Sequence, residues 1–156
     1  MDGIMGRLVV VLSCLWLFPG CTYVVSDITK VDLRIVATAD VNPDDSGRPS
    51  PVVVQVVELA SPQGFESAEF FALYDLQEQT LGADRLAVEE FEFKPGDMRD
   101  LKFALKPEAG YVGILAAYRQ LDKVNWRLVL ALDSKQKNQV TVLLNSRGVE
   151  LAATPY

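Results

Sequence analysis

Cys21 is the residue whose type and position most directly suggest chemistry in this sequence. It ends the stretch LWLFPGC, Leu15–Cys21, which closes the only long apolar run of the chain. A cysteine in this place could fill a core, form half of a disulfide, act as a nucleophile or carry a lipid. The other cysteine is Cys14, so no disulfide framework remains once an N-terminal segment is removed.

The composition excludes several kinds of functional site. The chain has no histidine, which excludes imidazole-dependent catalytic triads and the commoner zinc, copper and non-haem iron sites. It has 15 Lys and Arg against 21 Asp and Glu, with a formal net charge of -6. Because nucleic-acid binding requires clustered basic residues, this balance argues against nucleic acid as a partner.

The N-terminal 20 residues are predicted to be a signal peptide. Arg7 precedes an apolar run over 8–18, which is too short to span a bilayer because a spanning helix needs about 20 residues. A buried N-terminal helix is the alternative, and the Pro19-Gly20 pair argues against it.

Gly20 and Cys21 together resemble a bacterial lipobox, in which the cysteine thiol receives a diacylglycerol. Phe18 departs from that pattern, which usually has Leu there, and Cys14 is a second formal match preceded by a shorter apolar segment. The resemblance implies lipidation at Cys21, and two or more acyl chains give stable membrane anchoring. Thr22, in place of Asp, implies sorting to the outer membrane. Residues 21–30 are then a lipidated tether.

Alternating apolar and polar residues predict that most of the remaining chain is β-strand. The expected strands are 31–37, 51–59, 90–94, 101–106, 111–118, 126–132 and 140–145, with a last short one over 147–152. Segment 51–59 is rich in β-branched residues, which indicates burial on both faces or in the core. Many short strands separated by turns predict one mainly β domain over 31–156, an antiparallel β-sandwich.

Segment 65–82 interrupts the alternation and predicts a helical insertion. Phe65, Ala68, Ala72 and Leu76 share one helical face, and Gly82 provides a C-terminal stop. We expect the insertion to pack on one edge or end of the sandwich.

The segment from Thr38 to Pro51 is too long for a tight hairpin. Asn-Pro and Asp-Asp-Ser-Gly are strong turn signals, and Pro43, Pro49 and Pro51 restrict the backbone. Such a loop can present a shaped surface for binding. An ordinary surface connection with solvated Asp44 and Asp45 is the alternative.

A second polar group follows the apolar strand in VGILAAYRQLDKVNWR: Arg119, Asp122, Trp126 and Arg127. Trp and Arg are enriched at interface hot spots, so these residues could form a secondary interface. Alternatively, Trp126 fills the core and Arg119 ties a loop to Asp122.

Taken in order, the lipobox cysteine, a first strand, ADVNPDDSGRPSPVVV, the helical FESAEFFAL and VGILAAYRQLDKVNWR closely resemble the TssJ (SciN-like) family of type VI secretion outer-membrane lipoproteins. The resemblance implies a transthyretin-like β-sandwich with an added helical element. It also implies a periplasm-facing adaptor, lipid-anchored to the outer membrane. The implied partner is the periplasmic C-terminal region of the inner-membrane TssM (IcmF-like) protein, and through it the TssL-containing membrane complex.

The resemblance also places the partner-binding loop. Its residues here are Ala39, Asp40, Val41, Asn42, Pro43, Asp44, Asp45, Ser46, Gly47, Arg48 and Pro49. The expected contacts among them are Val41, Asn42, Pro43, Asp44, Asp45 and Arg48.

Three function classes follow, and a non-catalytic adaptor is the one that the sequence favours. An envelope lipoprotein that binds a small hydrophobic ligand is the alternative, which requires an apolar cavity between the sheets. The lack of histidine and of a Gly-rich phosphate loop argues against an enzyme. We expect no catalytic residues, metal or cofactor, apart from the covalent lipid on Cys21.

Overall fold

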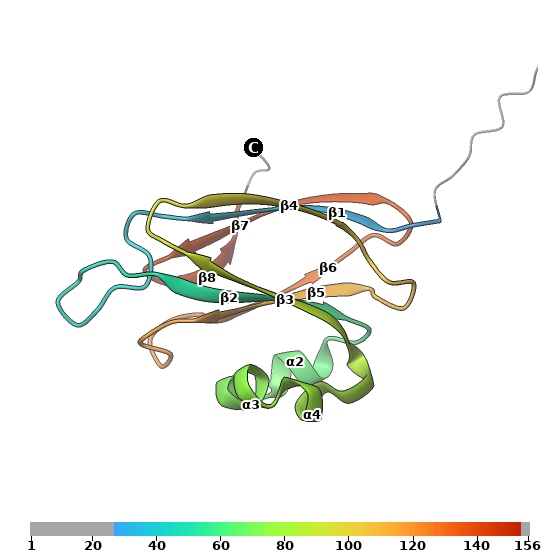
Figure 1. Cartoon of the computed structure of the whole chain (residues 1–156), viewed down its shortest axis with the longest axis horizontal. Coiled ribbons are helices and arrows are strands. Elements are labelled where there is room, and N and C mark those ends of the chain that lie inside the picture. The colour runs from blue at the N-terminus through green and yellow to red at the C-terminus, as the bar shows by residue number, and fades with distance from the viewer. Residues whose placement is uncertain (1–26, 154–156) are drawn as a thin grey trace, which may run out of the picture.

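The computed structural model describes residues 27–153 (Figure 1). The expected signal peptide over 1–20, the lipidation site Cys21 and tether residues up to 26 lie outside this range. Within 27–153, no helix is both long enough and apolar enough to span a membrane.

Within residues 27–153, eight strands form two four-stranded sheets that face each other, as Figure 1 shows. The first sheet has the order β4 (Met98–Ala104), β1 (Lys30–Ala37), β7 (Lys137–Asn145), β8 (Gly148–Leu151). The second has the order β3 (Arg85–Phe93), β2 (Val52–Leu59), β5 (Tyr111–Ala117), β6 (Arg127–Ala131). The predicted β-sandwich is confirmed.

One strand pair departs from the expected antiparallel pairing. β1 and β7 run parallel, in a register that starts at Lys30 opposite Lys137 and ends at Ala37 opposite Leu144. Parallel neighbours need a long crossover connection. Here that connection is the whole of β2 to β6, most of which lies in the other sheet.

The core between the sheets follows from the alternation in the sequence. In β1, Val31, Leu33 and Ile35 are almost fully buried, while the residues between them face outward. They share one apolar cluster with Val54 of β2 and Ile114 of β5. The period of two in the sequence therefore does place one face of each strand in the core.

The predicted helical insertion is present, and it consists of three short helices. The helices are α2 (Gln63–Ser67), α3 (Phe70–Asp75) and α4 (Gln77–Leu81), followed by the 3-10 turn η2 (Gly82–Asp84). The backbone is extended at Ala68 and Glu69, which ends α2.

These breaks let side chains from each helix reach the same sheet, which one straight helix could not arrange. Phe65, Phe70, Leu73 and Leu81 are buried together against β2 and β5. Leu76, expected on the buried face, is 51% exposed. Figure 1 shows the three helices covering the outer face of the second sheet, so the expectation that the insertion packs on an edge or end of the sandwich is wrong.

Gly113 of β5 provides the space for this packing. A Cβ at Gly113 would lie 2.7 Å from Cζ of Phe65, which is closer than real contacts allow. The aromatic ring therefore rests directly on the backbone of the strand. With the insertion on one side and the core on the other, β5 is buried on both faces. β2 buries one face in the core, as the run over 51–59 predicted, while Val53 and Gln55 on its other face are only half-buried.

Candidate functional site

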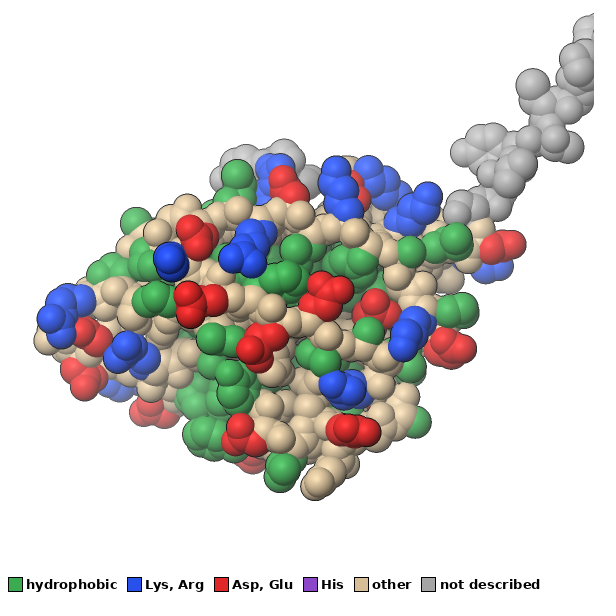
Figure 2. Space-filling view, in the orientation of Figure 1, with side chains coloured by type: hydrophobic (Ala, Val, Ile, Leu, Met, Phe, Trp, Pro, Cys, Tyr) green, Lys and Arg blue, Asp and Glu red, His purple; other side chains and the backbone are tan. Residues whose placement is uncertain are grey.

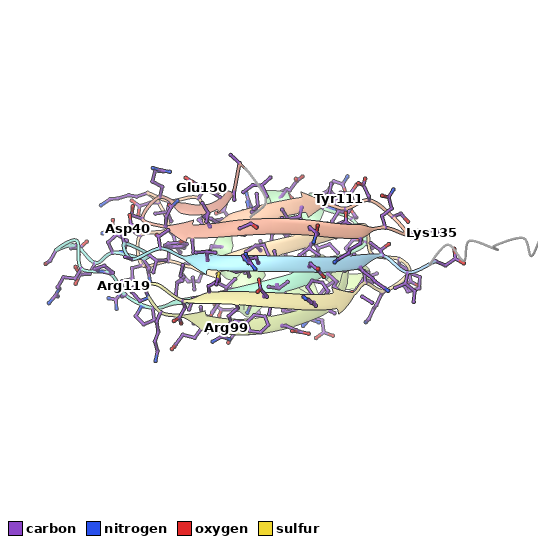
Figure 3. All side chains as sticks on the ribbon, turned by 90° about the horizontal axis from the view of Figure 1, so that it is seen from above. Asp40, Arg99, Tyr111, Arg119, Lys135 and Glu150 are labelled. Carbon is purple, nitrogen blue, oxygen red and sulfur yellow. The ribbon has the colours of Figure 1, made fainter. Side chains whose placement is uncertain are left out.

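The candidate partner-binding loop connects β1 to β2 and projects beyond both sheets at one end of the sandwich (Figure 1). In Figure 3, Asp40 and Arg119 lie at this end and Lys135 lies at the opposite end, where β1 begins. The loop and the start of the described chain are therefore at opposite ends of the long axis of the domain.

Asn42 holds the base of the loop from inside. Its Nδ2 donates to the Pro51 carbonyl at 2.6 Å, and its Oδ1 accepts from the Arg119 backbone N–H at 2.8 Å. Its own carbonyl accepts from Ser50 Oγ at 2.5 Å. Asn42 has a φ of 48°, a left-handed conformation that asparagine adopts more readily than most residues. This set of bonds fixes the path of both loop arms.

Asp44 organises the tip of the loop. Its Oδ1 accepts from the backbone N–H groups of Ser46, at 2.9 Å, and Arg48, at 3.0 Å. Its Oδ2 accepts from Arg48 Nε at 2.8 Å. These bonds, the one from the Arg48 backbone first, lower the pKa of Asp44 below its ordinary value. Gly47, at a φ of 76°, closes the turn in a conformation that favours glycine.

Asp40 fastens the loop to the turn between β7 and β8. Its carboxylate accepts from the Thr38 hydroxyl, and also from Ser146 Oγ at 2.7 Å. The Thr38 bond is the main cause that lowers the pKa of Asp40. The carboxylate therefore stays ionised at neutral pH and keeps both bonds.

The second polar group supports the loop from the β5–β6 connection. Arg119 Nε donates to Ser50 Oγ at 2.9 Å, and Gln120 Nε2 donates to Asp45 Oδ1 at 2.7 Å. The Asn42–Arg119 bond joins residues that are 77 positions apart. The two sequence motifs thus meet at one end of the fold. The expected Arg119–Asp122 tie is wrong, since these bonds link Arg119 to the first loop while Asp122 is exposed.

Trp126 and Arg127 belong to the helical insertion's packing. The Trp126 ring is half-buried and meets Phe70 edge-on at 5.3 Å. The Arg127 guanidinium lies 4.5 Å from the centre of the Trp126 ring and donates to the carbonyls of Phe65, at 3.1 Å, and Ala68, at 2.6 Å. Both residues join the insertion to β6, which fits the structural role more closely than a secondary interface.

Part of the expected contact set lies inside the protein. Val41 is fully buried and Asn42 is 3% exposed, so neither can touch a partner in this conformation and that part of the expectation is wrong. The other loop residues are exposed or half-buried: Ala39, Asp40, Pro43, Asp44, Asp45, Ser46, Gly47, Arg48 and Pro49. The loop's accessible surface is therefore mainly its tip.

Four residues of this end were missed from the sequence: Thr38, Ser50, Gln120 and Ser146. Ser50 lies between Pro49 and Pro51, where a hydroxyl that fixes the loop is a reasonable expectation. No local signal marks Ser146, because its role depends on a contact with Asp40, 106 residues away.

In residues 27–153, no group of three or more His, Cys, Asp or Glu side chains could hold a metal ion. A small cavity lined by Val56, Val88 and Phe103 has a volume of about 20 Å³. A cavity of that size has room for about one water molecule and not for a hydrophobic ligand.

Comparison with known proteins gives a family match over residues 29–147. The matching family is described as "Type VI secretion lipoprotein, VasD, EvfM, TssJ, VC_A0113". No curated protein sequence matches the chain significantly.

Solved structures show the same fold. The crystal structure of the type VI secretion lipoprotein TssJ1 from Pseudomonas aeruginosa superposes with a TM-score of 0.80 at 30% identity, over 83% of this chain and 98% of that one. Serratia marcescens Lip, a membrane-bound component of the type VI secretion system, gives 0.74 at 24% identity, over 79% and 96%. A chain in a structure titled as the TssM C-terminal domain from EAEC gives 0.68 at 23% identity, over 80% and 98%.

Proposed function

Because the chain belongs to the type VI secretion lipoprotein family, we propose that it is a non-catalytic adaptor of the trans-envelope secretion complex. In this role a lipid on Cys21 anchors the domain to the outer membrane, facing the periplasm. The β1–β2 loop binds the periplasmic C-terminal domain of a TssM-like inner-membrane protein, and through it the TssL-containing complex.

The observation that carries this proposal is the preorganised loop at the end of the sandwich farthest from the start of β1. Asn42 and Asp44 hold its base and tip through backbone and side-chain hydrogen bonds. A loop that is already ordered loses little conformational entropy on binding, which favours affinity for a partner. An anchor at one end leaves the opposite end free to face that partner.

The accessible tip offers a mixed surface that suits a protein. Asp45 and Arg48 place opposite charges on it, and Arg48 is 79% exposed at its side chain. Pro43 and Pro49 add rigid apolar area. Such a surface can be recognised by paired charges around a small apolar contact.

The binding test uses the domain from Thr22 to Tyr156, titrated calorimetrically with the periplasmic C-terminal fragment of its TssM-like partner. Asp45→Arg should weaken binding about tenfold or more, because it reverses a charge at the tip. Glu108→Arg makes the same charge change in the β4–β5 connection and should leave the affinity unchanged. Both side chains are exposed, so neither variant should unfold the domain.

Two results would contradict the proposal. The first is saturable binding that Asp45→Arg leaves intact, which places the interface elsewhere on the domain. The second is no binding by a folded wild-type domain, which leaves an anchored β-sandwich without this partner and makes ligand screening the next step.

A further inference from the structure

The helical insertion carries a cluster of aromatic rings that reaches the surface. Phe70 stacks on Tyr74 with centroids 5.4 Å apart and meets Phe71 and Trp126 edge-on, each at 5.3 Å. Phe70 is buried, whereas Phe71 is 66% exposed. We call Phe70, Phe71, Tyr74 and Trp126 the aromatic patch. In Figure 2, apolar side chains gather at the lower left, where Figure 1 places α3.

The exposure of Phe71 is not required by the packing of the insertion. Phe65, Leu73 and Leu81 already bury their side chains against β2 and β5. Burying a phenylalanine side chain fully contributes about 1.5–3 kcal/mol, and Phe71 gains only a minor part of this in the free domain. Phe71 contacts Phe70 edge-on and keeps most of its side chain exposed, so it is an apolar anchor that is available for contact.

The surroundings of the patch are acidic. Segment 63–84 contains five carboxylates and no basic residue: Glu66, Glu69, Asp75, Glu78 and Asp84. β3 adds Glu90, whose carboxylate accepts from Gln55 Nε2 at 3.0 Å. Burial raises the pKa of Tyr74, and the negative charges of Glu90 and Asp75 raise it further.

Two arginines lie close by, and both donate to groups of the insertion. Arg127 donates to the carbonyls of Phe65 and Ala68, and Arg85 Nε donates to Gln77 Oε1 at 2.8 Å. Their side chains are half-buried, while most of the carboxylates are exposed. The patch therefore combines an exposed aromatic anchor with an excess of negative charge.

We propose that the aromatic patch is a second docking surface, separate from the β1–β2 loop, and that its occupant is a basic amphipathic segment of a partner protein. Such a segment places an apolar side chain against Phe71 and its Lys or Arg side chains among the carboxylates of the insertion. Apolar anchors flanked by charge pairs are the usual pattern of helix recognition on protein surfaces.

The charge distinguishes this occupant from two others. An anionic lipid surface attracts basic segments and would repel the acidic insertion. A second copy of the domain, related by a two-fold axis, would bring two identical acidic surfaces together. A basic protein segment gains binding free energy both from the apolar contact with the patch and from the carboxylates around it.

The test uses the domain that starts at Thr22, in which Trp126 is the single tryptophan and forms part of the patch. Its fluorescence is followed while a short amphipathic helical peptide of leucine and lysine is added, and the same is done with a leucine–glutamate peptide. We expect a saturable change with the lysine peptide that weakens as salt is added. The glutamate peptide should give none.

Variants test where the lysine peptide binds. Phe71→Ser should weaken the affinity for the lysine peptide about tenfold. Leu151→Ser, which removes another exposed apolar side chain on β8, should leave this affinity unchanged. Asp75→Gln should also weaken the affinity for the lysine peptide, whereas Glu108→Gln should not. Equal binding of both peptides, or binding that Phe71→Ser leaves unchanged, would overturn the proposal. Thermal melting checks that each variant is folded. None of these results depends on the loop or on a TssM-like partner.

Discussion

At the scale of single residues, polar side chains hold the loop end of the domain. The sequence patterns located several of these side chains but revealed only part of their roles. The Asn-Pro and Asp-Asp-Ser-Gly signals predicted a shaped loop, and Asp44 does close its tip. Val41 and Asn42 look like surface residues in the sequence. Asn42 is buried by the packing of Arg119 and Ser50 around it, and Val41 joins the apolar cluster between the sheets; no local pattern reveals either contact.

Asn42→Ala should destabilise the domain by about 2–4 kcal/mol. The change leaves the Arg119 N–H and the Pro51 carbonyl without this partner, and alanine fits a positive φ poorly. Asn42→Gly is the control, since it removes the same side-chain hydrogen bonds but glycine adopts a positive φ without strain. Denaturant titration measures both. If the alanine variant is as stable as the wild type, Asn42 does not hold the loop.

The carboxylate of Asp44 gives the loop a defined acid sensitivity. Its pKa is lowered from the ordinary value of 3.8, so its stabilising effect is present above about pH 4 and is lost as the pH falls through the lower, folded-state pKa. Asp44→Asn should therefore have a lower melting temperature than the wild type at pH 7. The difference should shrink below pH 4. A constant difference across that range would show that ionisation of Asp44 does not stabilise the loop.

At the scale of elements, the strands were predictable and their partners were not. Alternation located the strands because one face of each meets the core. The parallel pairing of β1 with β7 depends on the path of the chain through the other sheet, which has no local signature. The insertion was correctly expected to be helical. Its breaks at Ala68, Glu69 and Leu76 arise from tertiary packing, which outweighs helix propensity over so short a segment.

Gly113→Ala should separate the insertion from the sheet and cost about 1–3 kcal/mol of stability, because the added methyl group would overlap the ring of Phe65. Gly110→Ala is the matched control, since nothing lies within 4 Å of a Cβ at that position. Phe65→Leu in the Gly113→Ala background should restore part of the loss, in a double-mutant cycle. Additive effects of the two changes would contradict direct contact.

At the scale of the whole molecule, the two ends of the domain have different proposed roles. The loop lies at one end, and β1 begins at the other, a few residues after the proposed lipid site. This arrangement suits a domain that is anchored at the end where β1 begins and binds its partner with the loop at the opposite end. The sequence alone predicted the fold and family, while the structure divided the loop into buried supports and an accessible tip.

Cys21→Ser should leave a folded domain that no longer fractionates with the outer membrane, because it removes the proposed lipid attachment. Thr22→Ser is a control that keeps the cysteine. Membrane fractionation with an antibody to the domain gives the readout. A Cys21→Ser protein that still sediments with the outer membrane would show that another feature anchors the chain.

Amide hydrogen exchange of the domain, with and without the periplasmic fragment of the TssM-like partner, tests the central claim most directly. We expect slower exchange on binding in residues 43–49 and around Gln120, with no change in the β6–β7 connection near Lys135 at the opposite end. Protection at the Lys135 end, or an unchanged loop in a saturated complex, would contradict the proposed role of the β1–β2 loop.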